Sequence, residues 1–219
     1  MLFLALPLVT GLSAATILAG LLAVNTIQSG PLIIENEYND VFSASTRSKM
    51  TYQSLAGLKS KKDFTQLFLR CKAPATFSTG EFMGTYDGYL LNLGVCAPLS
   101  KFISNRLFGP GEWAGKELGL TDGVNLFLKK KPYHSSTSSD TPTHLIKAKR
   151  FTCSIELSVL DGQDAIRLNY APFNKLDAIA WGMQDELRIV NKDLLIGCGG
   201  LALSGGVRNF APFYLVRQK

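Results

Sequence analysis

Few residues of this sequence have the chemistry that catalysis needs. Its two histidines, His134 and His144, both fall in a Ser/Thr-rich stretch that is typical of a polar loop. A buried Ser-His-Asp or Cys-His set therefore has no base at hand. Asp185 and Glu186 are adjacent carboxylates, but neighbours on a strand point to opposite faces, which separates them. These residues predict a protein that is not an enzyme.

Metal and cofactor motifs are weak as well. The four cysteines are widely spaced, with no C-x-x-C and no Cys/His pair, so zinc and iron–sulfur sites are not expected. We expect small buried side chains, with two disulfides as the alternative in an oxidising compartment. The shortage of histidine also argues against bis-His haem and leaves no chlorophyll ligand near the N-terminus. No cofactor of the protein's own is predicted. The cysteines are Cys71, Cys96, Cys153 and Cys198.

One glycine-rich segment matches a nucleotide motif in form only. Gly197-x-Gly199-x-x-Ala202 has the spacing of the dinucleotide-binding fingerprint and follows a predicted strand. The residues after it supply neither a crossover helix nor an acidic ribose ligand. We interpret the segment as a strand in which backbones approach closely.

The charge pattern does not indicate nucleic-acid binding. The net charge is +6, and the tightest basic runs are residues 59–62 and 129–131. Neither run is interleaved with the aromatic residues that stack on bases. These lysines predict a solvated face, suited to anionic lipid or to an acidic partner.

The N-terminus predicts a transmembrane helix over residues 1–27. From Leu2 to Val24 no residue is charged, and such a stretch is about long enough to cross a 30 Å hydrocarbon core. A signal peptide is the alternative, but only Met1 precedes the apolar run, so the basic n-region is missing. The flanking charges leave the orientation of the helix open, and an upstream targeting peptide already removed would leave no trace.

Small residues lie on one stripe of this predicted helix. Gly11, Ala15 and Ala19 are spaced four apart, which lets a second membrane helix approach closely. The alternative is that membrane helices are rich in glycine and alanine without packing there. The stripe is the predicted helix-packing site.

Residues 28–80 are predicted to be a connector with one short amphipathic helix. Gly30 and Pro31 end the first helix, and Asp63 can cap a second. That second helix has apolar residues at positions i, i+3, i+4 and i+7, beginning with Phe64. Residues 81–219 then begin with a predicted helix over Tyr86–Leu107, which Gly109 and Pro110 stop.

After Gly111 the period of hydrophobicity changes to two. Apolar residues alternate with polar ones from Phe151 to Val159, and Asp161-Gly162 supplies a hairpin turn. Short loops between successive strands indicate antiparallel neighbours, and closure into a barrel removes exposed edges. We predict an up-and-down β-barrel of about seven strands, with a two-sheet sandwich as the alternative. The side chains expected to fill it are Phe151, Ile155, Leu157, Leu168, Tyr170 and Trp181.

Two motifs give the barrel a family resemblance. Gly111-Glu112-Trp113 resembles the G-x-W start of a lipocalin-type (calycin) barrel, and Arg217 stands on the last predicted strand. The resemblance implies eight strands and an Arg217 side chain packed over the Trp113 ring. Segments 184–188 and 208–213 are also similar to uncharacterised lipocalin-like proteins of algae and plants. That likeness implies a plastid, with the thylakoid favoured over the mitochondrial inner membrane.

Two functions are compatible with a membrane helix joined to such a barrel. In the favoured one, the protein is a non-catalytic accessory subunit of a larger membrane complex, of photosynthesis rather than respiration. Its partners are then other membrane subunits, which contact the helix and the barrel surface. In the alternative, the barrel is a tethered carrier that binds a lipid, pigment or quinone near the bilayer.

The accessory-subunit hypothesis makes a prediction at the small-residue stripe. Gly11→Leu with Ala15→Leu should leave the protein in the membrane pellet after carbonate washing, because leucine is favourable in a membrane helix. Co-purification of partner subunits in mild detergent should be lost, because the leucine side chains prevent the backbones of the two helices from approaching closely. Leu6→Ile with Leu22→Ile is the control, and partners that co-purify normally with the bulky variant would contradict the hypothesis.

Overall fold

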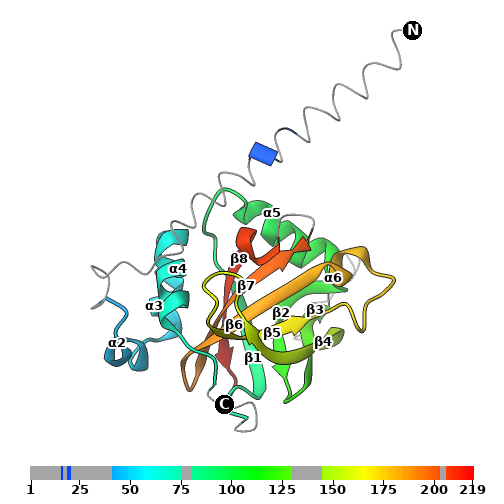
Figure 1. The fold of residues 1–219 in the computed structure, drawn as a ribbon. Helices are drawn as coiled ribbons and strands as arrows, with labels where there is room; N and C mark the ends of the chain where they lie inside the picture. Colours follow the sequence, from blue (N-terminus) through cyan, green and yellow to red (C-terminus); the bar gives the residue numbers. More distant parts are fainter. Residues whose placement is uncertain (1–15, 17–18, 21–40, 75–79, 130–144, 203–205) are drawn as a thin grey trace, which may run out of the picture.

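Eight strands close into a barrel in the computed structural model of this protein (Figure 1). The structure describes residues 41–74, 80–129, 145–202 and 206–219, together with Thr16, Ala19 and Gly20. The strands are β1 Gly84–Leu90, β2 Gly111–Leu118, β3 Asp122–Lys129, β4 Leu145–Leu157, β5 Asp164–Asn169, β6 Met183–Asn191, β7 Leu194–Leu201 and β8 Ala211–Arg217.

Each strand pairs antiparallel with the next strand in the sequence, and β8 returns to pair with β1. Leu90 lies opposite Phe213 at one end of that closing seam, and Tyr86 lies opposite Arg217 at the other. This topology confirms the predicted antiparallel up-and-down barrel, and it excludes the two-sheet sandwich. The barrel has the eight strands that the lipocalin resemblance implies rather than the seven counted from the sequence.

The uncounted strand is β1, at the start of the predicted helix Tyr86–Leu107. That prediction is wrong for its first part, because the helix α5 begins only at Ala97 and runs to Phe102. It continues as the π-helical turn η3, Ile103–Leu107. Thr85 and the two tyrosines of the Gly84–Leu90 segment favour a strand, but the leucine-rich sequence behind it dominates the periodicity.

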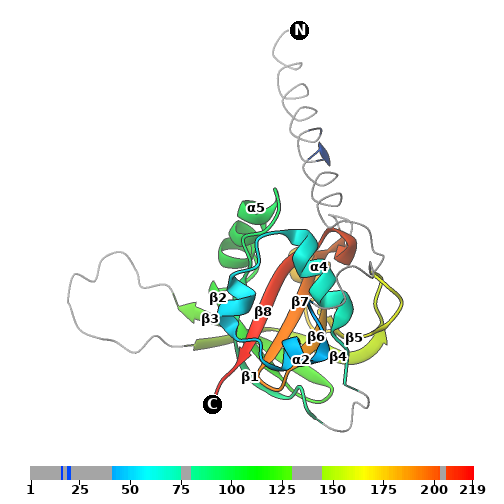
Figure 2. The same cartoon turned by 90° about the vertical axis from the view of Figure 1, so that its left-hand side faces the viewer.

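Three short helices cover the outside of the barrel over β6, β7 and β8 (Figure 2). The largest, α4 Lys61–Arg70, buries its apolar face, as the i, i+3, i+4 spacing predicts. Its N-cap is Ser60 and not the predicted Asp63: the Ser60 hydroxyl accepts from the Asp63 backbone N–H at 3.0 Å. The other two helices are α2 Ala44–Ser48 and α3 Tyr52–Ala56.

Arg188 ties α4 to the barrel from a fully buried position on β6. Its guanidinium donates to the Phe68 carbonyl at 3.2 Å and lies 4.6 Å from the centre of the Phe68 ring. The same group binds both carboxylate oxygens of Asp161, at 2.6 and 2.8 Å, in the turn between β4 and β5. One buried cation therefore joins the outer helix, a strand and the predicted Asp161-Gly162 turn.

Aromatic and aliphatic side chains fill most of the barrel interior. Phe151, Leu168 and Tyr170 point inward, as the alternation predicts. Leu157 and Trp181 do not, since they are 66% and 57% exposed. Leu157 is the last residue of β4, and Trp181 ends a short helix, α6 Ala178–Trp181, so neither lies beside the core.

Arg217 makes the closing cation–π contact with a different ring from the one the resemblance implies. Its guanidinium lies 4.9 Å from the centre of the Tyr86 ring and donates to the backbone carbonyls of Glu81 and Met83. Trp113 instead packs edge-on against Phe213 at 5.6 Å. The strand register explains the exchange, because Tyr86 lies directly opposite Arg217 whereas Trp113 lies opposite a residue of β3.

The predicted transmembrane helix 1–27 lies almost entirely outside the described residues, and so do Gly11 and Ala15 of its stripe. Ala19 is described as helical and exposed. Within the part of the chain that the structure describes, no helix combines the length and the apolar character needed to cross a bilayer. The anchor and its packing site stay predictions.

All four cysteines are buried as thiols, which agrees with the interpretation of them as small core side chains. Cys71 packs beneath the outer helices, and Cys153 lies in the barrel interior. Burial raises the pKa of each of these two thiols to about 12.

These thiols predict a loss of stability at alkaline pH. Between about pH 9 and 12 the unfolded chain releases thiol protons that the folded chain keeps, so the free energy of unfolding falls as the pH rises. At pH 10 each thiol contributes a loss of about 1.4 kcal/mol. The experiment is a urea titration under reducing conditions at pH 8 and at pH 10. Between these pH values the free energy of unfolding should fall by about 2–3 kcal/mol less for the double variant Cys71→Ala with Cys153→Ala than for the wild type. Equal falls would contradict this account.

Candidate functional site

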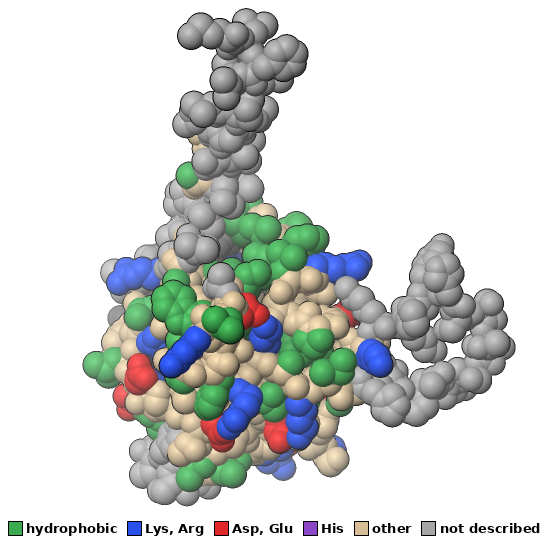
Figure 3. Space-filling view, turned by 90° about the vertical axis from the view of Figure 1, so that its right-hand side faces the viewer, with side chains coloured by type: hydrophobic (Ala, Val, Ile, Leu, Met, Phe, Trp, Pro, Cys, Tyr) green, Lys and Arg blue, Asp and Glu red, His purple; other side chains and the backbone are tan. Residues whose placement is uncertain are grey.

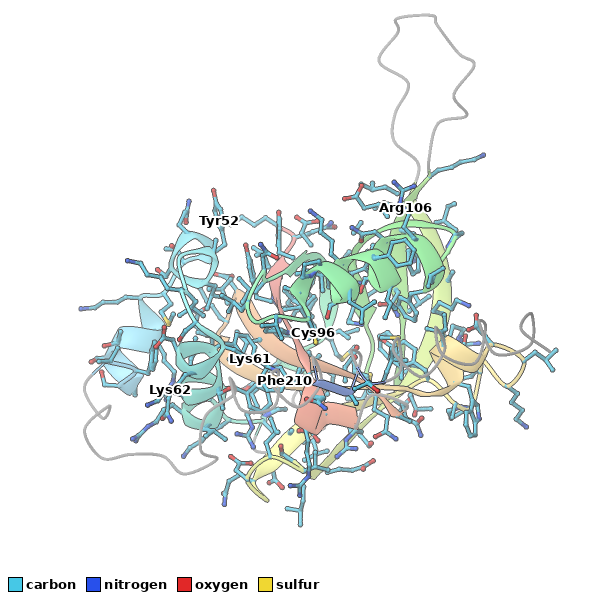
Figure 4. All side chains as sticks on the ribbon, turned by 90° about the horizontal axis from the view of Figure 1, so that it is seen from above. Tyr52, Lys61, Lys62, Cys96, Arg106 and Phe210 are labelled. Atoms are coloured by element: carbon cyan, nitrogen blue, oxygen red, sulfur yellow. The ribbon has the colours of Figure 1, made fainter. Side chains whose placement is uncertain are left out.

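A cavity of about 100 Å³ lies at the end of the barrel that α5 covers. Figure 4 shows α5 and η3 crossing this end, with Cys96 just before the first turn and Arg106 near the last. Leu99 of α5 lines the cavity and is 39% exposed, so the cavity reaches the surface beside this helix. Its walls are mostly apolar and include Leu90, Leu99, Ile103, Phe108, Met183 and Phe213.

Two charged side chains stand in this apolar wall, Lys116 of β2 and Asp185 of β6. Their exposed fractions are 3% and 2%, and Lys116 Nζ lies 2.9 Å from Asp185 Oδ2. Lys116 also donates to Asn125 Oδ1 at 2.8 Å and to the Tyr170 hydroxyl oxygen at 2.6 Å. The ammonium group is therefore held by three oxygen atoms in the interior of the barrel.

The partners of Lys116 are bound to each other. The Tyr170 hydroxyl donates to Asp185 Oδ2 at 2.8 Å, and Asn125 Nδ2 donates to the Tyr170 hydroxyl oxygen at 3.2 Å. The Trp113 indole N–H donates to Asn125 Oδ1 at 2.9 Å. Three strands, β2, β3 and β6, and the residue after β5 thus meet in one buried network, and each member fixes the orientation of another.

Aromatic rings surround the ammonium group as well. Lys116 Nζ lies 5.2 to 5.5 Å from the ring centres of Trp113, Phe151, Tyr170 and Phe213. At these distances the ring faces attract a cation, and they replace part of its lost hydration. The cation is held by electrostatic contacts from every side of the barrel interior.

Burial governs the titration of this network. It lowers the pKa of Lys116 below its ordinary value, and the neighbouring Asp185 acts in the opposite direction. Burial also raises the pKa of Tyr170 well above its ordinary value, and the Asp185 carboxylate raises it further. Tyr170 is therefore a hydrogen-bond donor, and not an anion, throughout the physiological pH range.

A β-bulge in β2 turns Lys116 into the barrel. The register of β2 against β3 shifts between Trp113 and Gly115, so Trp113 and Lys116 both become buried although they are three positions apart. Gly115 has φ +153°, and a Cβ there would lie 1.9 Å from the Tyr86 carbonyl oxygen. Only glycine fits this bulge, so the position of the charge depends on Gly115.

A second β-bulge brings a backbone carbonyl group into the network. The pairing of β3 with β4 shifts between Val124 and Asn125, so Lys149 of β4 has no opposite residue on β3. Its backbone is left-handed, with φ 58°. The Lys149 carbonyl accepts from Asn125 Nδ2 at 3.0 Å, while its ammonium group binds Asp177. The two bulges, on the strands on either side of β3, thus aim the polar groups at the same point.

Asp185 lines the cavity, and one of its carboxylate oxygen atoms is unpartnered within the described part of the chain. Its Oδ1 atom is buried and has no hydrogen-bond partner among the described residues. Asp185 lies opposite Gly199 on β7, and a Cβ at that position would approach Oδ1 to 3.2 Å. Gly199 also lines the cavity, and because it has no side chain, no Cβ lies between it and Oδ1.

Glu186 points away from this site, as its place next to Asp185 predicts. It is buried on the outer face of β6, where it binds Arg167 at 2.7 Å and accepts from the Ser158 hydroxyl and the Val159 backbone N–H. The two carboxylates thus serve separate networks and form no acid–base pair.

Comparison with known proteins assigns no family to this chain. No family profile and no curated protein matches the sequence. A crystal structure of a protein from Thermomonospora curvata overlaps 70% of this chain and 84% of its own, with a TM-score of 0.41 and 17% sequence identity. The assignment of a closed barrel rests on the strand pairing of this chain itself.

The structure brings only part of the predicted site together. Trp113 lines the cavity, but Gly111 lies at the beginning of β2 and Arg217 at the far end of the barrel seam. Gly199, taken from the nucleotide-like segment, lies beside the cavity. At Gly197 a Cβ would come within 2.2 Å of the Phe213 ring, which agrees with close packing.

The sequence prediction missed Lys116, Asn125, the role of Tyr170 and the inward direction of Asp185. Simple alternation from Trp113 places Lys116 on the outer face, so the pattern itself hides the residue. The one available signal is Gly115, a glycine inside a strand, which often marks a bulge. Among the described residues no cluster of His, Cys, Asp and Glu could hold a metal ion.

The buried ion pair predicts a large effect on stability. Lys116→Met leaves Asp185 as an uncompensated buried charge and should lower the free energy of unfolding by about 3–5 kcal/mol in urea titrations. Adding Asp185→Asn should recover part of this loss. Lys147→Met is the control, because Lys147 forms an exposed pair with Glu117 and should change stability by less than about 1 kcal/mol. Additive effects of Lys116→Met and Asp185→Asn would contradict the coupling.

Proposed function

We propose that the barrel is a small-molecule binding protein, and that it holds a mostly apolar ligand in the cavity beneath α5. The observation that carries this proposal is an apolar cavity with one unpartnered carboxylate oxygen, Asp185 Oδ1, in its wall. An apolar pocket with few convergent polar groups is typical of a ligand site. A buried acceptor without a partner is destabilising, and a ligand donor group relieves that cost.

The size of the cavity limits what enters it. A volume of about 100 Å³ is smaller than the roughly 150 Å³ cavity that encloses a benzene molecule. Only one end of a larger molecule fits, with the rest leaving past the half-exposed Leu99. A lipid-like chain meets this requirement, whereas a ring system the size of a pigment does not.

This proposal is the carrier alternative rather than the accessory-subunit hypothesis, which stays a separate prediction. The carrier is favoured because Asp185 Oδ1 has no hydrogen-bond partner among the described residues, which is a cost that a ligand offsets. Figure 3 shows apolar side chains gathered at the upper end of the domain, where α5 lies in Figure 1. This distribution supports a position of the α5 end next to another apolar surface. Exposed apolar residues at that end include Phe102 and Leu107.

The proposal predicts saturable binding of a chain-like probe. Titration of 1-decanol should change the fluorescence of Trp113, which lines the cavity, with a stoichiometry of one. The measurement uses the Trp181→Phe variant, because Trp181 is exposed and would obscure the signal. Leu99→Trp should weaken binding by at least about tenfold, since it fills the mouth and displaces buried methylenes.

Leu107→Trp is the matched control for this experiment. Leu107 is 50% exposed on η3 and is not part of the cavity wall, so the same change in volume there should leave binding intact. A wild-type protein that shows no saturable signal with 1-decanol, or a Leu99→Trp variant that binds as well as Leu107→Trp, would overturn the proposed function.

A further inference from the structure

We infer that the cavity selects its ligand by a neutral hydroxyl donor, which binds Asp185 Oδ1, and that it rejects carboxylates and acceptor-only groups. The inference rests on the proposed function and names the chemistry of the ligand head. It follows from the hydrogen bonds that the buried network makes among the described residues.

All hydrogen-bond donors of the network are used inside the protein. Lys116 has three N–H bonds, and they meet Asn125, Tyr170 and Asp185. Asn125 Nδ2 has two, and they go to the Lys149 carbonyl and to Tyr170. The Tyr170 hydroxyl donates to Asp185. None of these groups has a donor left for a ligand.

The hydrogen-bond acceptors of the network are also occupied, except one. Asn125 Oδ1 receives the Trp113 and Lys116 donors, and the Tyr170 oxygen receives Lys116 and Asn125. Asp185 Oδ2 receives Tyr170 and Lys116. The atom that remains is Asp185 Oδ1, so the network offers a ligand one acceptor and no donor.

The charge balance of the network excludes ionic heads. A ligand carboxylate placed in the cavity faces Oδ1 of like charge, and Lys116 behind it is already surrounded by oxygen atoms and rings. A ligand ammonium group adds a second buried cation to an Asp185 that Lys116 already neutralises. A neutral hydroxyl supplies the missing donor without adding charge.

The other polar side chains that line the cavity are Ser100, Ser104 and Asn209. The Ser100 hydroxyl donates to the Cys96 carbonyl at 3.1 Å, which leaves its oxygen as a further acceptor. Ser104 also lines the cavity and carries a rotatable hydroxyl. A site built around Ser104 would tolerate acceptor-only ligands, so this residue enters the experiment as a variant.

Access to Oδ1 depends on Gly199. A Cβ at this position would lie 3.2 Å from Asp185 Oδ1 and 3.6 Å from both the Ala211 carbonyl oxygen and the Phe213 ring. An alanine methyl group therefore fits with a small adjustment, but it occupies the space in front of the carboxylate. Gly199→Ala removes the approach of a donor and leaves the ion pair itself in place.

The test compares two isomers, 1-decanol and 1-methoxynonane, with decanoate at pH 8 by isothermal titration calorimetry. The isomers have the same atoms, but only the alcohol has a donor. The wild type should bind 1-decanol about tenfold to a hundredfold more tightly than 1-methoxynonane, as expected for a hydrogen bond to a charged group. Decanoate should show no measurable binding.

Two variants assign the preference to Asp185. Asp185→Asn and Gly199→Ala should each reduce the advantage of the alcohol to about threefold or less. Asp164→Asn, which changes an exposed carboxylate on β5, and Ser104→Ala should keep the full advantage. Thermal unfolding of every variant checks that it is folded, and Gly199→Ala retains the test if Asp185→Asn does not fold.

The outcomes separate the two proposals. If the wild type binds neither isomer, the proposed function fails, and this inference fails with it. If both isomers bind equally, or if decanoate binds best, the barrel is a carrier but the hydroxyl selection is wrong. If Asp185→Asn and Gly199→Ala keep the advantage while Ser104→Ala loses it, the selecting group is Ser104 and the inference is overturned.

Discussion

The barrel interior is organised around one ion pair, Lys116 with Asp185, which has almost no contact with solvent. Removing two such charges from water is expensive, on the order of several kcal/mol for each ion. The structure offsets this with three oxygen partners and four aromatic rings around the ammonium group. Strand closure, the two bulges and the inward aromatic residues all serve to keep these partners in place.

The architecture could be predicted where local patterns control it. Alternation from Phe151 onward and the Asp161-Gly162 turn specify antiparallel neighbours, and closure follows from the need to protect edges. The first strand escaped prediction because Leu91, Leu93 and the helix behind them follow Gly84–Leu90 and dominate the pattern. The lipocalin resemblance implied Trp113 as the ring beneath Arg217, whereas the guanidinium lies over Tyr86, its partner across the β1–β8 seam.

The candidate site was harder to predict because it depends on exceptions to the pattern. Lys116 faces inward only because the bulge at Gly115 shifts the phase of β2 by one residue. Lys149 contributes a carbonyl only because its backbone is left-handed. The sequence does show that Asp185 and Glu186 separate, but which of them faces the cavity depends on the register of β6 against its neighbours. Long-range pairing, and not local preference, decides these directions.

The central claim is that Asp185 Oδ1 is the atom that meets the ligand. It is tested most directly by carbon NMR of protein labelled at the aspartate carboxyl carbons, titrated with 1-decanol. The account predicts that the Asp185 carboxyl resonance shifts and saturates with the ligand, while those of Asp161 and Asp164 stay in place. An Asp185 resonance that does not move at saturating 1-decanol would contradict it.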